Sequence, residues 1–171
     1  MSRKKRQNIV LGIITIVVIG FVIAYYYSAE QTRIKGFTFG NNLQRIQEDL
    51  KKIQTDFQSE ITVWEEGDIS TDKFLGYSDI HILKMEELVS RYDALDSPEV
   101  FSSSVELFKL STQSQLESDK EIIRWIQSGD MDAKIRSDSL IEESFGYEMA
   151  ALAKFNAVKT ELTHNFFKYV N

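Results

Sequence analysis

The amino-acid sequence has no cysteine among its 171 residues. The chain therefore forms no disulfide bond, offers no thiolate ligand to a metal ion, and has no cysteine for lipid attachment. A domain built without disulfides depends on its own hydrophobic core, and the roughly 140 residues that follow Tyr27 are enough for one such core.

Histidine is almost as scarce, with two in the chain. Glu161 and His164 have the Glu-x-x-His spacing of di-iron bundle proteins, but such a centre needs two of these pairs and two further glutamates. The sequence also lacks a glycine-rich phosphate loop, a Gly-x-Ser-x-Gly motif and a His-Glu-x-x-His motif. We therefore expect no metal site, no cofactor and no enzyme activity.

One long apolar run, from Ile9 to Tyr27, contains no charged residue. As a helix rising about 1.5 Å per residue it would cover roughly 28 Å, close to the hydrocarbon thickness of a bilayer. Basic residues precede the run and acidic residues begin only at Glu30, so we expect a cytoplasmic N-terminus and an extracytoplasmic remainder. The residues assigned to this anchor are Arg3, Lys4, Lys5 and Arg6 before the run, Gly20 and Ala24 as a small-x-x-x-small step for helix contact, and Tyr25, Tyr26 and Tyr27 at the outer lipid interface.

A cleaved signal peptide is the alternative explanation of this basic and apolar pattern. Signal cores usually span about 7–15 residues and end with small residues one and three places before the cut. Here the run is longer, and cleavage after Ala29 would place the bulky Tyr27 at the third position. We therefore expect an uncleaved, single-pass anchor in the cell membrane.

The charge differs between the two sides of the apolar run. The formal net charge is −6, and the basic residues before the run carry +4, so the remainder carries −10. Nucleic-acid phosphates require lysine and arginine, so this acidic remainder argues against nucleic acid as a partner.

These features divide the chain into a basic tail (1–8), a transmembrane helix (9–27), a juxtamembrane linker (28–40) and an extracytoplasmic domain (41–171). Gly36 and Gly40 mark places in the linker where a helix from the membrane can stop or bend. Asn41 or Asn42 is then expected to cap the first helix of the domain.

Beyond the linker, apolar residues recur at alternating steps of three and four in four stretches, as in amphipathic helices. The core-facing positions are Leu43, Ile46, Leu50, Ile53, Phe57, Ile61 and Trp64; Phe74, Ser78, His81, Met85, Leu88, Tyr92 and Leu95; Phe101, Val105, Phe108, Thr112, Gln115, Asp119, Ile122 and Ile126; and Ile141, Phe145, Met149, Leu152, Phe155, Leu162, Phe166 and Tyr169. Gly67, the single proline Pro98, and Gly129 separate the stretches. We predict an all-α fold, with one transmembrane helix followed by an antiparallel up-down four-helix bundle.

The fourth stretch, from about residue 131 to about residue 169, is the longest and should return to the membrane. We expect residues 164–170 to pack on Ile34, Phe37 and Phe39 or to touch the lipid interface.

Polar residues interrupt the second and third stretches. With the turn centred on residues 96 and 97, antiparallel pairing places His81 level with Thr112 and one turn from Gln115, and Asp119 lies deeper. Burying a polar group without a partner costs about 1–3 kcal/mol, so these side chains are expected to bond to one another. Two roles stay open: a hydrogen-bonded layer that fixes helix register, and a pocket for a small solute or ion.

The layout of a basic tail, one spanning helix and an acidic four-helix domain resembles the outer half of chemoreceptor-type sensory proteins. Those receptors re-enter the membrane and carry a cytoplasmic helical module, whereas here only residues 1–8 precede the anchor, so sensing would have to pass through another subunit.

Two functions follow as hypotheses. The first is a structural or accessory subunit of a membrane or envelope assembly, with the lipid bilayer and a membrane or envelope protein as partners and self-association left open. The second is a small-solute binding module with its site around His81, Thr112, Gln115 and Asp119.

Overall fold

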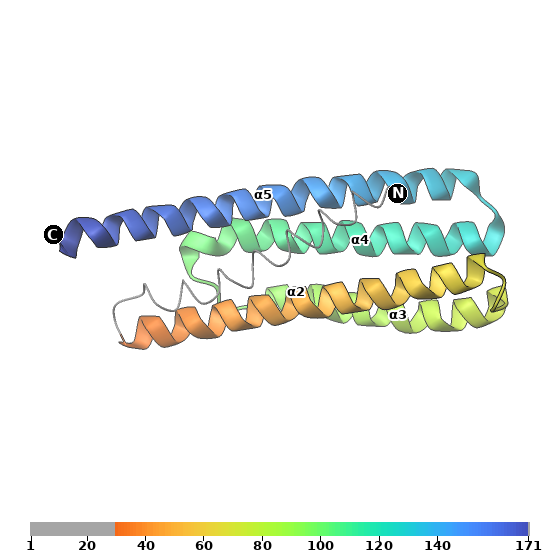
Figure 1. The fold of residues 1–171 in the computed structure, drawn as a ribbon, viewed down its shortest axis with the longest axis horizontal. Coiled ribbons are helices and arrows are strands. Elements are labelled where there is room, and N and C mark those ends of the chain that lie inside the picture. The colour runs from red at the N-terminus through yellow and green to blue at the C-terminus, as the bar shows by residue number, and fades with distance from the viewer. Residues whose placement is uncertain (1–29, 171) are drawn as a thin grey trace.

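The computed structural model describes the backbone of residues 30–170 and the side chains of residues 38–161. Within that range the chain forms four long helices, one short 3-10 helix and no strand. The elements are α2 (Glu30–Glu65), α3 (Thr71–Asp93), η1 (Glu99–Phe101), α4 (Ser102–Ser128) and α5 (Met131–Val170). Consecutive helices run in opposite directions, with α4 and α5 forming one side of an elongated bundle and α2 and α3 the other (Figure 1). The predicted all-α four-helix bundle is confirmed.

The predicted transmembrane helix, with its flanking arginines, lysines and tyrosines, lies outside the described residues. Within residues 30–170, no helix is both long enough and apolar enough to cross a bilayer.

Local signals explain where the helices begin and end. Ser70 caps α3, because its side-chain oxygen accepts a hydrogen bond from the backbone N–H of Lys73 at 3.3 Å. Gly129 ends α4 in the left-handed conformation, with φ of 73°, which a residue without a Cβ adopts at no steric cost. The end of α4 at Gly129 lies where the sequence predicts it.

The start of the first helix differs from the prediction. α2 begins at Glu30 and continues through Gly36 and Gly40, so neither Asn41 nor Asn42 caps it. Glycine inside a helix costs only about 1 kcal/mol relative to alanine. Burial of Phe39, which is 2% exposed and lies 5.6 Å from the Phe101 ring, offsets that cost.

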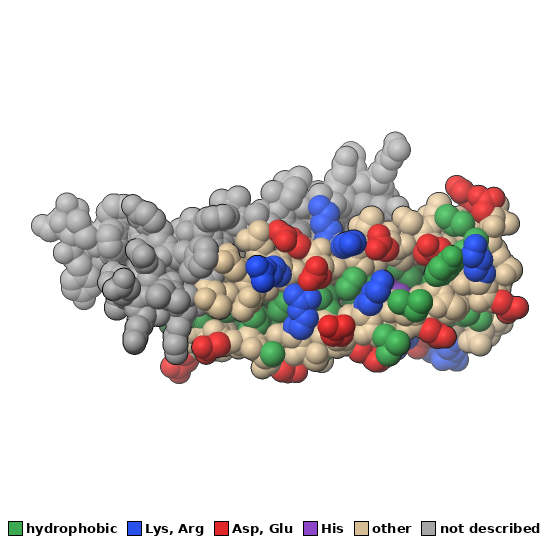
Figure 2. Space-filling view, turned by 90° about the horizontal axis from the view of Figure 1, so that it is seen from below, with side chains coloured by type: hydrophobic (Ala, Val, Ile, Leu, Met, Phe, Trp, Pro, Cys, Tyr) green, Lys and Arg blue, Asp and Glu red, His purple; other side chains and the backbone are tan. Residues whose placement is uncertain are grey.

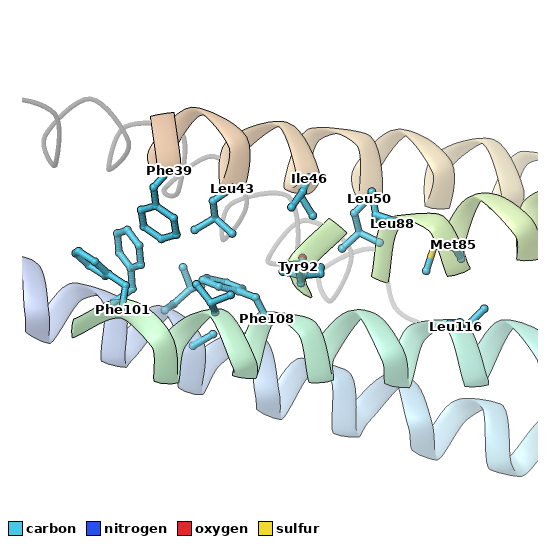
Figure 3. Close-up of a cluster of buried hydrophobic side chains, with 14 residues drawn as sticks. Phe39, Leu43, Ile46, Leu50, Met85, Leu88, Tyr92, Phe101, Phe108 and Leu116 are labelled. Atoms are coloured by element: carbon cyan, nitrogen blue, oxygen red, sulfur yellow. The ribbon is translucent and has the colours of Figure 1, made fainter. Parts of the chain in front are cut away.

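Two hydrophobic clusters fill the bundle. The larger occupies the half near the start of α2 (Figure 3) and contains Phe39, Leu43, Ile46, Leu50, Met85, Leu88, Tyr92, Phe101, Val105, Phe108, Leu116, Ala151, Leu152 and Phe155. The smaller lies near the α2–α3 turn and contains Phe57, Ile61, Phe74 and Ile126. Burial of these side chains is the main source of stability in a domain without disulfides.

Small side chains line the contact between α4 and α5 and allow the two helices to approach closely. The Ser111 and Ser144 hydroxyl oxygens are 3.1 Å apart, and the Ser118 hydroxyl donates to the Ser137 carbonyl oxygen at 2.8 Å. On each helix the two serines are seven residues apart, the spacing of a coiled-coil seam.

The predicted core face of the fourth helix is wrong in part. Leu152 and Phe155 are buried as expected, but Met149 is 62% exposed, and Ile141 and Phe145 are only half-buried. The inward face instead carries small and polar residues, namely Ala133, Ser137, Ser144, Glu148 and Ala151. Up to Ala151 the inward face of this helix is thus made of small and polar residues, and large apolar residues take over at Leu152 and Phe155.

The expected packing of residues 164–170 on Ile34, Phe37 and Phe39 stays a prediction, because the side chains of residues 164–170, Ile34 and Phe37 lie outside those that the structure describes. The backbone shows that the start of α2 and the end of α5 extend beyond α3 and α4 at the same end of the bundle (Figure 1).

Replacing Ser144 with leucine tests the close packing of α4 and α5. Added methylenes at a well-packed contact force the helices apart, so we expect Ser144→Leu to lower the free energy of unfolding by about 1–3 kcal/mol. Ser139→Leu, at an exposed position of the same helix, should change it by less than about 0.5 kcal/mol. Chemical denaturation of the full-length protein in detergent measures both, and equal effects would show that the small side chain is not required.

Candidate functional site: the polar layers of the core

The His81 layer consists of three side chains from three helices. The Nε2 atom of His81 on α3 lies 2.8 Å from Oδ2 of Asp119 on α4. The same carboxylate oxygen accepts a hydrogen bond from the Gln54 side-chain amide of α2 at 2.7 Å. When Asp119 is ionised its oxygens can only accept, so a neutral His81 then carries its proton on Nε2.

This layer is closed off from solvent. His81 is 6% exposed and Asp119 is 5% exposed. The Phe57 ring stacks on the imidazole, with ring centroids 3.8 Å apart and planes 6° from parallel. Burial raises the pKa of Asp119 above its ordinary value, and the hydrogen bond and charge of His81, with the Gln54 hydrogen bond, act in the opposite direction.

The position of the layer in the chain explains its structural effect. Phe57 and Phe74 belong to the smaller hydrophobic cluster, and Met85 belongs to the larger one. Gln54 precedes Phe57 on α2, and His81 lies between Phe74 and Met85 on α3. The layer therefore separates the two clusters. Sliding one helix past another would leave a buried carboxylate without its partners.

The Tyr92 layer lies within the larger cluster (Figure 3). The Gln47 amide donates to the Tyr92 hydroxyl oxygen at 2.6 Å. The Thr112 hydroxyl oxygen is 3.1 Å from the Tyr92 hydroxyl and 3.0 Å from the Phe108 carbonyl oxygen. Because a hydroxyl has one proton, Tyr92 donates to Thr112 when Thr112 donates to Phe108. Burial raises the pKa of the Tyr92 hydroxyl, so this group stays neutral.

Glu148 brings a carboxyl group from α5 close to the Tyr92 layer. It is 8% exposed, and burial raises its pKa to about 7. Its charge contributes to the raised pKa of Tyr92, which places the two groups near each other. Among the described residues, no side chain or backbone group donates a hydrogen bond to this carboxylate, and its oxygens keep some contact with solvent.

The predicted set of four polar residues is divided between the two layers. The structure brings His81 and Asp119 together, but Thr112 bonds to Tyr92 and not to His81. Gln115 is half-buried and hydrogen-bonds to neither layer within the described residues. The predicted pairing of His81 with Thr112 is therefore wrong by seven residues, about two helical turns.

Two physical causes account for this error in register. The chain passes through η1 before α4 begins, so the turn is centred later than residues 96 and 97. In addition, helical side chains lean toward the N-terminus of their own helix. In two antiparallel helices they lean in opposite directions, so two side chains that meet come from Cα positions that are not level with each other.

The sequence-based prediction missed Gln47, Gln54 and Glu148. Gln47 and Gln54 each follow an isoleucine of the first apolar stretch and are seven residues apart, which is a detectable pattern of positions beside a core stripe. Glu148 offered no such signal, because the expected stripe of α5 ran through its neighbour Met149.

Comparison of the chain with protein-family models, with curated proteins and with solved structures finds no match. Within the described residues, no group of three or more histidine, aspartate or glutamate side chains is arranged to hold a metal ion.

A double-mutant cycle measures the coupling between His81 and Asp119. Each single substitution, His81→Leu or Asp119→Leu, leaves a buried polar partner and should lower the free energy of unfolding by about 3–5 kcal/mol. The double variant should recover most of this loss, because it removes both polar groups and leaves neither buried without its partner.

Arg91 and Asp49 provide the matched control, since they form an ion pair at 2.6 Å whose side chains are 36% and 49% exposed. Alanine substitutions in this pair should show a coupling below about 1 kcal/mol. Additive losses at His81 and Asp119, measured by denaturation near pH 7, would contradict their pairing.

Proposed function

We propose that this protein is a single-pass, membrane-anchored, extracytoplasmic helical bundle that acts as an accessory interaction subunit of a larger membrane or cell-envelope assembly. The proposed anchor is the apolar run 9–27, with the basic residues 3–6 on its cytoplasmic side. The bundle would then stand outside the membrane with its acidic surface in solvent.

The observation that carries this proposal is the outer α3 face, formed by Tyr77, Ile80 and Leu83. These side chains are 39%, 53% and 66% exposed, and successive members are three residues apart, so they are neighbours on one helix surface. Figure 2 shows the side of the bundle formed by α2 and α3, where hydrophobic side chains lie among acidic and basic ones. Adjacent large apolar side chains in solvent are typical of protein interaction surfaces.

The interior supports the same choice of function. A solute entering the core at His81 or Thr112 would have to replace hydrogen bonds that Asp119 and Tyr92 already make. Displacing satisfied buried bonds costs free energy, so the layers favour a role in helix register over solute binding. Partner binding is therefore assigned to the surface of the bundle.

Substitution of the outer α3 face tests the proposal. We expect the unmodified protein to be recovered from the membrane fraction and to co-purify with a partner after extraction in mild detergent. Ile80→Glu combined with Leu83→Glu should abolish the co-purification and leave the melting temperature almost unchanged, because both side chains are exposed.

Ile135→Glu combined with Met149→Glu is the matched control. These α5 residues are 63% and 62% exposed but stand apart from each other along the helix. This variant should keep the partner. Loss of the partner in both variants, or in neither, would contradict docking through α3, and recovery in the soluble fraction would contradict the anchor.

A further inference from the structure

Glu148 occupies the inward face of α5 at the level of the Tyr92 layer. Its neighbours one turn away on the same face, Ser144 and Leu152, are 3% and 8% exposed. At this level every helix contributes a buried polar side chain: Gln47 from α2, Tyr92 from α3, Thr112 from α4 and Glu148 from α5.

The environment of Glu148 differs from that of Asp119, which has His81 and Gln54 as partners. Near Glu148 the one titratable group facing it from α3 is Tyr92, and α2 and α4 contribute the uncharged Gln47 and Thr112. The α4 cation Lys109 is held by Asp93. Within the described residues, Glu148 therefore has no positive charge to stabilise its ionised form.

We propose that Glu148 is a proton-binding site in the core, and that its ionisation weakens the packing of α5 against the other helices. Removing most of the solvent from a carboxylate that has no counter-charge destabilises its ionised form. The protonated carboxyl group is neutral and can stay inside. The ionised group is better solvated when α5 moves away and water enters.

The direction of the effect follows from the two protonation equilibria. In the packed bundle the pKa of Glu148 is about 7, whereas its ordinary value is 4.5. Between these values the packed state holds the proton and the opened state releases it, so opening becomes more favourable as the pH rises. The effect levels off above the higher value, where both states are ionised.

A single cysteine reports the opening, because the chain has none of its own. Ser144→Cys places a thiol at a position that is 3% exposed, one turn from Glu148. The rate of modification by a thiol reagent is measured in full-length protein in detergent, with Glu148 intact and with Glu148→Gln. At each pH the rate with Glu148 intact is divided by the rate with Glu148→Gln. This ratio removes the intrinsic pH dependence of the thiol.

We expect this ratio to rise between tenfold and about a hundredfold from about pH 5 to about pH 8, with most of the rise below about pH 7. Glu161→Gln, an exposed glutamate of the same helix, should give a ratio that does not change with pH. A constant ratio for Glu148→Gln would overturn the proposal.

A second measurement needs no cysteine and serves if Ser144→Cys disturbs the packing. The melting temperature of the unmodified protein should fall relative to that of Glu148→Gln as the pH rises from about 5 to about 7. Glu161→Gln should follow the unmodified protein. Parallel melting curves for the unmodified protein and Glu148→Gln would show that Glu148 does not bind the proton in the packed state.

Discussion

The hydrogen-bonded pair of His81 and Asp119, joined by Gln54, is the interaction on which the arrangement of α2, α3 and α4 depends. Hydrophobic side chains alone tolerate a shift of one helix against another, because apolar contacts are not directional. A buried carboxylate does not, since a shift would remove its partners and leave a charge in the core. The layer therefore selects one register, and the two hydrophobic clusters on either side supply most of the stability.

The fourth helix is held by different means. α5 packs on α4 through small side chains such as Ser111 and Ser144, which allow close approach but provide little apolar area. At the same face Glu148 brings an acid without a counter-charge among the described residues. The bundle thus combines three helices that a paired polar layer aligns with a fourth whose packing responds to the charge of one carboxyl group.

Much of this fold could be predicted from the sequence, because α3 and α4 have strong end signals such as Ser70 and Gly129, and their apolar stripes are regular. The start of α2 was not predictable from local residues, since burial of Phe39 overrides two helical glycines. The core face of α5 was predicted at Leu152 and Phe155 but missed before them, because there the face is small and polar. His81 and Asp119 could be identified as buried polar residues, but their exact pairing depends on turn geometry and side-chain direction, which spacing alone does not fix.

The pairing of His81 with Asp119 can be observed directly, because the chain contains only two histidines. Selective 15N labelling of histidine in the full-length protein in detergent gives signals from two imidazole rings, and a His164→Gln variant shows which ring each signal belongs to. We predict that the Nε2 proton of His81 exchanges slowly with water and that Asp119→Ala removes this protection. Fast exchange at both imidazoles, unchanged by Asp119→Ala, would contradict a buried polar layer that holds the helices in register.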